Sequence, residues 1–167
     1  PILLQARTPI AADETYGELE LRLSELGALA LIEALTLVAL NQAAERPQDE
    51  AGATYAGKID RSMARIPWHE GCGVVGRLIR AYDPRPGAYT VLNGTEVKLF
   101  GARELPLPAE HPDANPGEVL GLDDYGLVVA CGEGALSVAF AQPEGRKRLT
   151  AQSWAVGRGV AKGMVFT

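Results

Sequence analysis

QDEAGATYAGKIDRSMARIPWHEGCGVVGRLIRAYDPRPGAYT, residues 48–90, is the stretch that decides how this chain is organised. Its first part is polar and has neither a helical nor an alternating apolar period, which favours a linker. Its second part carries an apolar stripe at helical spacing: Val74, Val75, Leu78 and Ile79. The prolines and the glycine that follow end a helix. We therefore expect a linker that enters a packed module through a short helix at about residues 71–82.

The same stretch holds a spaced basic trio and a tryptophan. Lys58, Arg61 and Arg65 precede Trp68, which stands just before the expected helix. An aromatic residue in that place is more often a hydrophobic anchor than a platform for a nucleic-acid base. We therefore expect Trp68 to lie in the core, and Trp154 near the end of the chain as well.

The composition indicates an ordered globular protein. The chain has 167 residues, 47% of them hydrophobic, enough for one good core or for a small domain plus part of another. No run of about 18 apolar residues occurs, so no membrane span is expected. The chain shows no signal-peptide pattern, and it begins without Met, directly on an apolar run, which predicts a fragment or a processed chain. Cys72 and Cys131 stand far apart, which favours buried, reduced thiols in the cytosol over a disulfide framework or a zinc site.

The formal net charge of −5 is distributed unevenly along the chain. Residues 1–57 contain three basic and nine acidic residues, whereas residues 58–167 contain thirteen basic and twelve acidic ones. The second part is therefore not a strongly basic nucleic-acid module overall. Any contact with a polyanion has to come from local clusters of basic residues.

The first forty residues predict an extended connection followed by a long helix. Residues 2–10 are expected to be a strand end or connection, and the helix to run from about residue 16 to residue 40. Thr15 and Glu18 have the spacing of a capping box, in which each side chain accepts from the backbone N–H of the other. Apolar residues recur every three to four positions and also occupy other sides of the helix. So wide an apolar surface needs partners on more than one face, including a body that this chain does not contain.

Beyond the helix at 71–82 the pattern changes to short strands. Asn93-Gly94 lies between strands expected at 88–92 and 96–100, and it predicts a hairpin because a type I′ turn needs positive φ at both central residues. Three more strands are expected, at 117–122, 126–131 and 135–140. They are connected by turns at Asp123-Asp124 and at 132–134.

The remaining segments complete the expected fold. Residues 104–116 predict a proline-rich loop, residues 142–148 a basic loop, and residues 150–156 a short helix. About five short strands after one helix predict an α+β fold with an OB-like antiparallel β-barrel. A generic antiparallel sheet is the alternative.

An ordered series of short motifs runs through nearly the whole chain: Pro9-Ile10, Thr15, Gly17-Glu18-Leu19, Gln48-Asp49-Glu50, Ala53-Thr54-Tyr55-Ala56, Lys58-Ile59, Trp68, Arg80-Ala81, Pro86-Gly87-Ala88, Ala141-Gln142-Pro143 and Gly145-Arg146-Lys147. The series resembles the methionyl-tRNA formyltransferase family. Related folate-using formyltransferases share the pattern from Gln48 to Lys58, so the ordered combination is more specific than its parts.

The resemblance implies transfer of a formyl group from 10-formyltetrahydrofolate to methionyl-initiator tRNA in the cytoplasm. It also implies that residues 1–40 are the tail of a truncated Rossmann-like catalytic domain, with a strand end and a long helix. Residues 41–58 are then the linker, and residues 59–167 the C-terminal OB-like tRNA-binding domain. We expect a monomer without metal or membrane attachment, whose partners are the initiator tRNA and the missing N-terminal catalytic domain.

The chemistry of that family is not expected in this chain. The family has a catalytic Asn-x-His pair, and neither His69 nor His111 follows an asparagine at that spacing. The resemblance therefore implies that the catalytic and cofactor-binding residues lie outside the chain, which would be inactive alone and would provide tRNA binding. Two alternatives stay open. One is part of a formyltransferase for sugar nucleotides or of a formyl-folate hydrolase, and the other is a stand-alone nucleic-acid-binding barrel.

Six basic residues are the candidates for contact with tRNA phosphates: Lys58, Arg61, Arg65, Arg146, Lys147 and Arg148. Such contacts release counterions and need no reading of bases. By the resemblance, several of them fall where family members carry basic residues on the tRNA-facing side: Lys58, Arg61 and Arg146-Lys147. The alternative for each is an ordinary solvated surface charge. For Arg80 we expect another role, pairing with a carboxylate near the end of its helix.

Overall fold

A computed structural model describes all residues, 1–167, and divides the chain into two compact units. The first unit is Pro1–Ile59 and the second is Asp60–Thr167. No helix in the structure is both long enough and apolar enough to cross a membrane.

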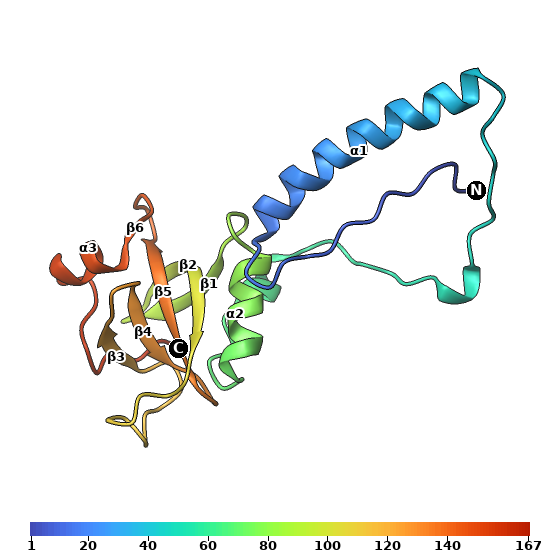
Figure 1. Ribbon diagram of the computed structural model, residues 1–167. Coiled ribbons are helices and arrows are strands. Elements are labelled where there is room, and N and C mark those ends of the chain that lie inside the picture. The colour runs from blue at the N-terminus through green and yellow to red at the C-terminus, as the bar shows by residue number, and fades with distance from the viewer. The chain divides into compact units, whose positions relative to one another are not determined.

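The first unit is built around the helix α1, Tyr16–Ala39 (Figure 1). Its start is fixed by the expected capping box: the Glu18 backbone N–H donates to Thr15 Oγ1 at 3.3 Å, and the Thr15 N–H donates to Glu18 Oε2 at 2.9 Å. These bonds satisfy two of the amide groups that a helix start leaves without partners. The predicted helix and its cap are confirmed.

The apolar side chains of α1 are largely exposed within this unit. None of its residues is buried, and the side chains of Leu29, Ile32 and Leu35 are each at least 60% exposed. The rest of the unit forms no sheet. It contains a single antiparallel bridge between Ile2 and Arg46 and a short 3-10 helix, η1, Glu50–Gly52. Residues 2–10 are thus a connection with one bridge.

The second unit is a six-stranded antiparallel sheet with two short helices (Figure 1). The strands are β1 Ala88–Leu92, β2 Thr95–Leu105, β3 Val119–Leu122, β4 Leu127–Ala130, β5 Ala135–Pro143 and β6 Leu149–Thr150. Their order is β1-β2-β5-β4-β3, and β6 pairs with the outer part of β5. The helices are α2, Cys72–Ala81, and α3, Ala151–Val156, and a 3-10 helix η2, Arg61–Ala64, precedes them.

The turn chemistry explains most of the sheet connections. Asn93 and Gly94 have φ of 51° and 78°, as the predicted hairpin between β1 and β2 requires. Asp123 ends β3 in a turn, where its carboxylate accepts from the backbone N–H groups of Tyr125 and Gly126. The hairpin β4–β5 closes over residues 132–134. These predicted turns are confirmed, together with the helices at 71–82 and 150–156 within a residue at each end.

Two strands are longer than the sequence pattern predicts, and one was not predicted. β2 and β5 pair from Val97–Pro143 to Leu105–Ala135, so the strand ends extend into segments expected to be loops. Each strand supplies the hydrogen-bonding partners that prolong the other, a cooperative effect that local propensity does not contain. The chain then turns back after Pro143 and pairs with β5 as β6, and the pairing of β2 with β5 places Gln142 in the sheet.

A row of three aromatic rings closes the core of this unit. Trp68 stacks on Phe166 with ring centroids 5.6 Å apart, and Phe166 stacks on Trp154 at 6.3 Å. All three are at least 93% buried. The indole N–H of Trp68 donates to Thr90 Oγ1 at 2.9 Å, which satisfies its one polar group inside the core. The prediction that both tryptophans belong to the core is confirmed.

The predicted barrel is confirmed only as a mixture of helices with an antiparallel sheet. The path of paired strands ends at β1 and at β3 and does not close on itself. The last residues lie along both edges. Val119 N–H donates to the Met164 carbonyl, Phe166 N–H donates to the Gly117 carbonyl, and Val91 and Thr167 exchange two backbone bonds at 2.9 and 3.0 Å.

The two cysteines lie in different surroundings. Both are free thiols. Cys131 is buried, and burial raises its pKa to about 12, whereas Cys72 at the start of α2 is only half-buried. The expectation of two buried thiols is therefore correct for Cys131 and wrong for Cys72, because the helix start faces partly outward.

A matched pair of glycine substitutions tests the packing of the chain end against β3. Gly117 has φ of +85°, and a Cβ there would lie 2.3 Å from the Phe166 carbonyl oxygen. Gly145 has a similar φ of +71°, with open space around it. Gly117→Ala should therefore lower the free energy of unfolding by about 3 kcal/mol more than Gly145→Ala, the difference being the clash. Urea unfolding followed by tryptophan fluorescence checks this, and equal losses would contradict the described packing.

The turn at Asp123 predicts a pH dependence of stability. Burial by itself would raise the pKa of Asp123, but hydrogen bonds from Ser137, Gly126 and Tyr125 outweigh it and lower the pKa below 3.8. The stabilisation by the ionised form is thus present above pH 4 and lost as the pH falls through the folded-state pKa. Asp123→Asn should lower the unfolding free energy by about 1 kcal/mol at pH 7. Urea titrations should show this deficit shrinking toward pH 3, and a deficit that does not change with pH would contradict the role of the Asp123 carboxylate.

Candidate nucleic-acid interface

The strands β1, β2 and β5 present one face away from the core. Val97 and Leu99 point into the core, so the alternate residues of β2 occupy the opposite side. Residues paired directly across an antiparallel sheet share a face. The register therefore defines an outer face with these members: Tyr89, Val91, Glu96, Lys98, Phe100, Phe140 and Gln142.

Arg61 lies at the β1 end of the outer face. Its guanidinium forms an ion pair with Glu96 and lies 5.5 Å from the centroid of the Tyr89 ring. The hydrogen bond to Glu96 raises the pKa of Arg61, yet 72% of the side chain stays exposed. Arg61 is thus oriented by its neighbours and still faces solvent.

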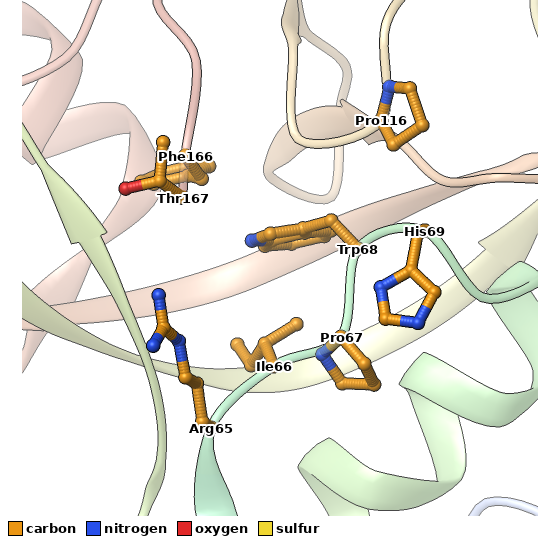
Figure 2. Close-up of a pocket in the computed structure, with 8 residues that line it drawn as sticks. All are labelled: Arg65, Ile66, Pro67, Trp68, His69, Pro116, Phe166 and Thr167. Carbon is orange, nitrogen blue, oxygen red and sulfur yellow. The ribbon is translucent and has the colours of Figure 1, made fainter.

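Arg65 follows one turn later, beside an open pocket of about 440 Å³. Its backbone bridges to Tyr89, and its side chain is exposed. The pocket is lined by Arg65, Ile66, Pro67, Trp68, His69, Pro116, Phe166 and Thr167, and Figure 2 shows Trp68 at the centre of these residues with Arg65 and His69 to either side. Trp68 is only 5% exposed, so it presents little ring surface to a stacked base.

Arg148 is held inside the second unit by several contacts. It donates to both carboxylate oxygens of Asp83, at 3.2 and 3.3 Å, and Asp83 is 7% exposed. Its guanidinium also lies 3.9 Å from the centroid of Phe100 and 4.8 Å from that of Phe140. These contacts make Arg148 the partner of a buried carboxylate.

Arg146 and Lys147 form the exposed turn between β5 and β6. The turn is fixed by the backbone, since Arg146 N–H donates to the Pro143 carbonyl and Gln142 Nε2 donates to the Arg146 carbonyl at 3.0 Å. Neither side chain has a carboxylate within ion-pair distance. Their charges are therefore available to an external anion.

Lys58 belongs to the first unit, where every residue from 51 to 59 is exposed. The other five candidates belong to the second unit. There the register brings Arg61 and Arg148 onto the outer face and places the turn of Arg146 and Lys147 beside it.

Comparison with known proteins places the second unit in a family. Residues 58–159 match the family model described as the formyl transferase C-terminal domain. The chain belongs to the formyltransferase family. The region that matches the family model begins at Lys58 and includes all six strands and α3.

Two curated relatives of this formyltransferase chain are methionyl-tRNA formyltransferases. The chain is 38% identical over 166 residues to the methionyl-tRNA formyltransferase of Jannaschia sp. (strain CCS1), covering 99% of this chain and 52% of the relative. It is 41% identical over 163 residues to that of Ruegeria pomeroyi, with 98% and 51% covered. The chain thus spans about half the length of the curated relatives it matches. The resemblance seen in the sequence motifs is confirmed.

Solved structures support the same fold. A HypX variant from Aquifex aeolicus superposes with a TM-score of 0.67 at 23% identity, covering 87% of this chain and 26% of that one. HypX in complex with tetrahydrofolic acid superposes with a TM-score of 0.58 at 26% identity, covering 74% and 22%.

Lys98 is a basic residue of this formyltransferase chain that the sequence motifs did not single out. It lies on the outer face opposite Tyr89 of β1 and Gln142 of β5. The alternation of inward and outward side chains along β2, with the Asn93-Gly94 hairpin, places Lys98 on the outer face. Its position between Arg61 and the Arg146–Lys147 turn, however, depends on the β2–β5 register. That register pairs Lys98 with Gln142, 44 positions later in the chain.

Other residues weighed from the sequence have ordinary surroundings. Arg80 pairs with a carboxylate, as expected, but the partner is Glu104 on β2 at 3.8 Å. His69 is 78% exposed and lies 3.6 Å from Glu70. No group of three His, Cys, Asp or Glu residues is arranged to hold a metal ion.

The Arg148–Asp83 pair can be tested by its effect on stability. Arg148→Met keeps an apolar stem over the two phenylalanine rings but leaves Asp83 buried without its cation. The unfolding free energy should fall by about 1–3 kcal/mol. Adding Asp83→Asn should recover at least half of the loss, and the control Arg146→Met should stay within about 0.5 kcal/mol of the parent chain. Thermal or urea unfolding measures all three, and a neutral Arg148→Met would exclude the structural role.

Proposed function

We propose that this chain is the C-terminal part of a methionyl-tRNA formyltransferase and that it binds the initiator methionyl-tRNA. The observation that carries the proposal is the match to curated methionyl-tRNA formyltransferases along 98–99% of the chain and about half of each relative. In this proposal the enzyme acts in the cytoplasm, as a monomer.

Electrostatics favours a local contact with RNA over a general one. The whole chain carries a net charge of −5, so its long-range field repels a polyanion. Attraction has to come from local exposed cations, above all from those without an internal carboxylate, such as Arg146 and Lys147. Each cation placed on a phosphate releases condensed counterions, which makes such a contact favourable at low salt. The proposed contacts are Lys58, Arg61, Arg65, Arg146, Lys147 and Arg148, and of these Arg61 and Arg148 also hold internal carboxylates.

The proposed domain boundaries separate a catalytic part from a tRNA-binding part. Residues 1–40 are the end of the catalytic domain, residues 41–58 the linker and residues 59–167 the tRNA-binding domain. The exposed leucines of α1 support this, since they need an apolar partner that the first unit does not provide.

We assign an OB-like barrel to the tRNA-binding domain. The bonds of residues 164–167 to the edges of β1 and β3 support it, because they connect the two ends of the open sheet. A nearly closed sheet leaves few unpaired edge groups and forms a rigid support for exposed side chains.

The formyl transfer itself is assigned to the part of the enzyme that this chain does not span. The sequence holds no Asn-x-His, and 10-formyltetrahydrofolate is proposed as the donor bound by the catalytic domain. A folate ligand is consistent with the HypX structure in complex with tetrahydrofolic acid. The role left to this chain is to hold the RNA while the amino group of its methionine reacts.

Charge reversal in the β5–β6 turn tests the proposal. The double variant Arg146→Glu, Lys147→Glu should weaken binding of labelled initiator tRNA by at least tenfold at about 0.1 M salt, and Lys58→Glu by a smaller factor. The expected slope of log K against log[salt] falls by about 1.5 for the double variant, since two phosphate contacts are lost. Fluorescence anisotropy over a salt series measures both quantities.

The control is Lys162→Glu, an exposed lysine whose neighbour Gly163 bonds to β3 at the opposite edge of the sheet. It should bind like the parent chain. Parent-like binding by the double variant and by Lys58→Glu would reject the assigned surface. Equal affinity for a generic single-stranded oligonucleotide would favour a stand-alone nucleic-acid-binding barrel instead, and protection of the linker from protease by a sugar nucleotide would favour the other formyltransferase class.

A further inference from the structure

We infer that Lys98 is a further phosphate-binding residue, which joins Arg61 and the Arg146–Lys147 turn into one continuous track for an RNA backbone across β1, β2 and β5. The inference rests on the proposed tRNA binding. The inference adds one contact, Lys98, to the proposed function. It also gives the path of the RNA backbone, which runs across the strands.

The register places Lys98 between the two basic clusters. On one side its pairing partner is Tyr89, whose ring lies under the Arg61 guanidinium. On the other side its partner is Gln142, whose side-chain amide donates to the Arg146 carbonyl. Neighbouring strands lie about 4.8 Å apart, so β1 and β5 are about 10 Å apart and Lys98 lies midway. Lys98 is the only cation in the row Tyr89–Lys98–Gln142, and Arg148 lies over Phe100 and Phe140 in the next row.

The Lys98 side chain is held in place, and its ammonium group keeps N–H donors for a ligand. Its ammonium group donates to the Pro86 carbonyl at 2.7 Å, which uses one of its three donors. Its stem packs against Gly87, where a Cβ would come within 2.8 Å of Lys98 Cδ. No carboxylate lies within ion-pair distance of Lys98. A half-buried cation with a fixed stem loses little side-chain entropy when it binds an anion.

The acidic groups near the track are mostly engaged by other cations. Glu96 is paired with Arg61, and Asp83 is paired with Arg148. Glu144 is exposed in the turn, and its backbone N–H donates to the Glu96 carbonyl. Lys98, Arg146 and Lys147 therefore have no carboxylate partner, whereas Glu144 interacts electrostatically with Arg61.

The partner that fits is a phosphodiester backbone. Cations at strand intervals match a ligand with repeated single negative charges, and the contact requires no base identity. The aromatic rings of the outer face do not offer a stacking platform, because Arg61 lies over Tyr89 and Arg148 covers Phe100 and Phe140.

The test compares Lys98→Met with the parent chain in tRNA binding over a salt series. Lys98→Met should weaken binding about three- to tenfold at low salt and reduce the slope of log K against log[salt] by about one. Lys98→Arg should keep most of the affinity and the slope, because it keeps the charge. Lys162→Met is the matched control and should leave both unchanged.

The outcomes separate this inference from the proposed function. If Lys98→Met binds like the parent while the Arg146 and Lys147 double variant loses binding, the track is rejected and the function stands. If the parent chain itself does not bind initiator tRNA, the proposed function fails, and the track with it.

A second measurement covers the case in which Lys98→Met does not fold, since Lys98 also holds the Pro86 carbonyl. Acetylation of the parent chain with and without tRNA, read by mass spectrometry, should show Lys98 protected by the RNA and Lys162 unprotected. An unchanged extent of acetylation at Lys98 would overturn the inference.

Discussion

The pairing of β2 with β5 is the interaction on which the second unit depends. It joins the middle of the domain to its last third, and through it the register of every outward side chain is set. A shift of one residue would send Val97 and Leu99 to solvent and bring Lys98 into the core. The hydrophobic burial of those side chains therefore holds in place both the fold and the alignment of the basic residues that the proposed RNA contact needs.

The candidate surface combines two kinds of cation with different tasks. Arg148 donates hydrogen bonds to the buried carboxylate of Asp83, and the flat face of its guanidinium packs on two phenylalanine rings. It therefore connects the β6 side of the sheet to the segment after α2. Arg146 and Lys147, two and one residues earlier, have no such partners. Of these neighbouring basic residues, Arg148 therefore has a structural role, whereas Arg146 and Lys147 are available to bind an anion. The difference follows from their contacts and not from residue type.

Local chemistry made much of this fold predictable. Three features act within a few residues, and each correctly predicted the helix start or turn at its position: the capping box at Thr15, the Asn93-Gly94 turn and the carboxylate of Asp123. What the sequence did not disclose depends on distant partners. β6 and the outer end of β5 form because each finds hydrogen-bonding groups across the sheet, and Arg148 meets an Asp83 that is 65 positions away. Lys98 was overlooked for the same reason, since its neighbours on the face are assembled only by the register.

The bonds of residues 164–167 to β1 and β3 have a consequence for synthesis on the ribosome. Val91 of β1 is made 76 residues before Thr167, its partner across the edge, so during translation the backbone groups of Val91 are unpaired. A nascent sheet in this state is open to pairing with another chain. Polysomes that carry several copies at this stage bring such edges close together, so pairing between chains stays possible until residue 167 leaves the exit tunnel.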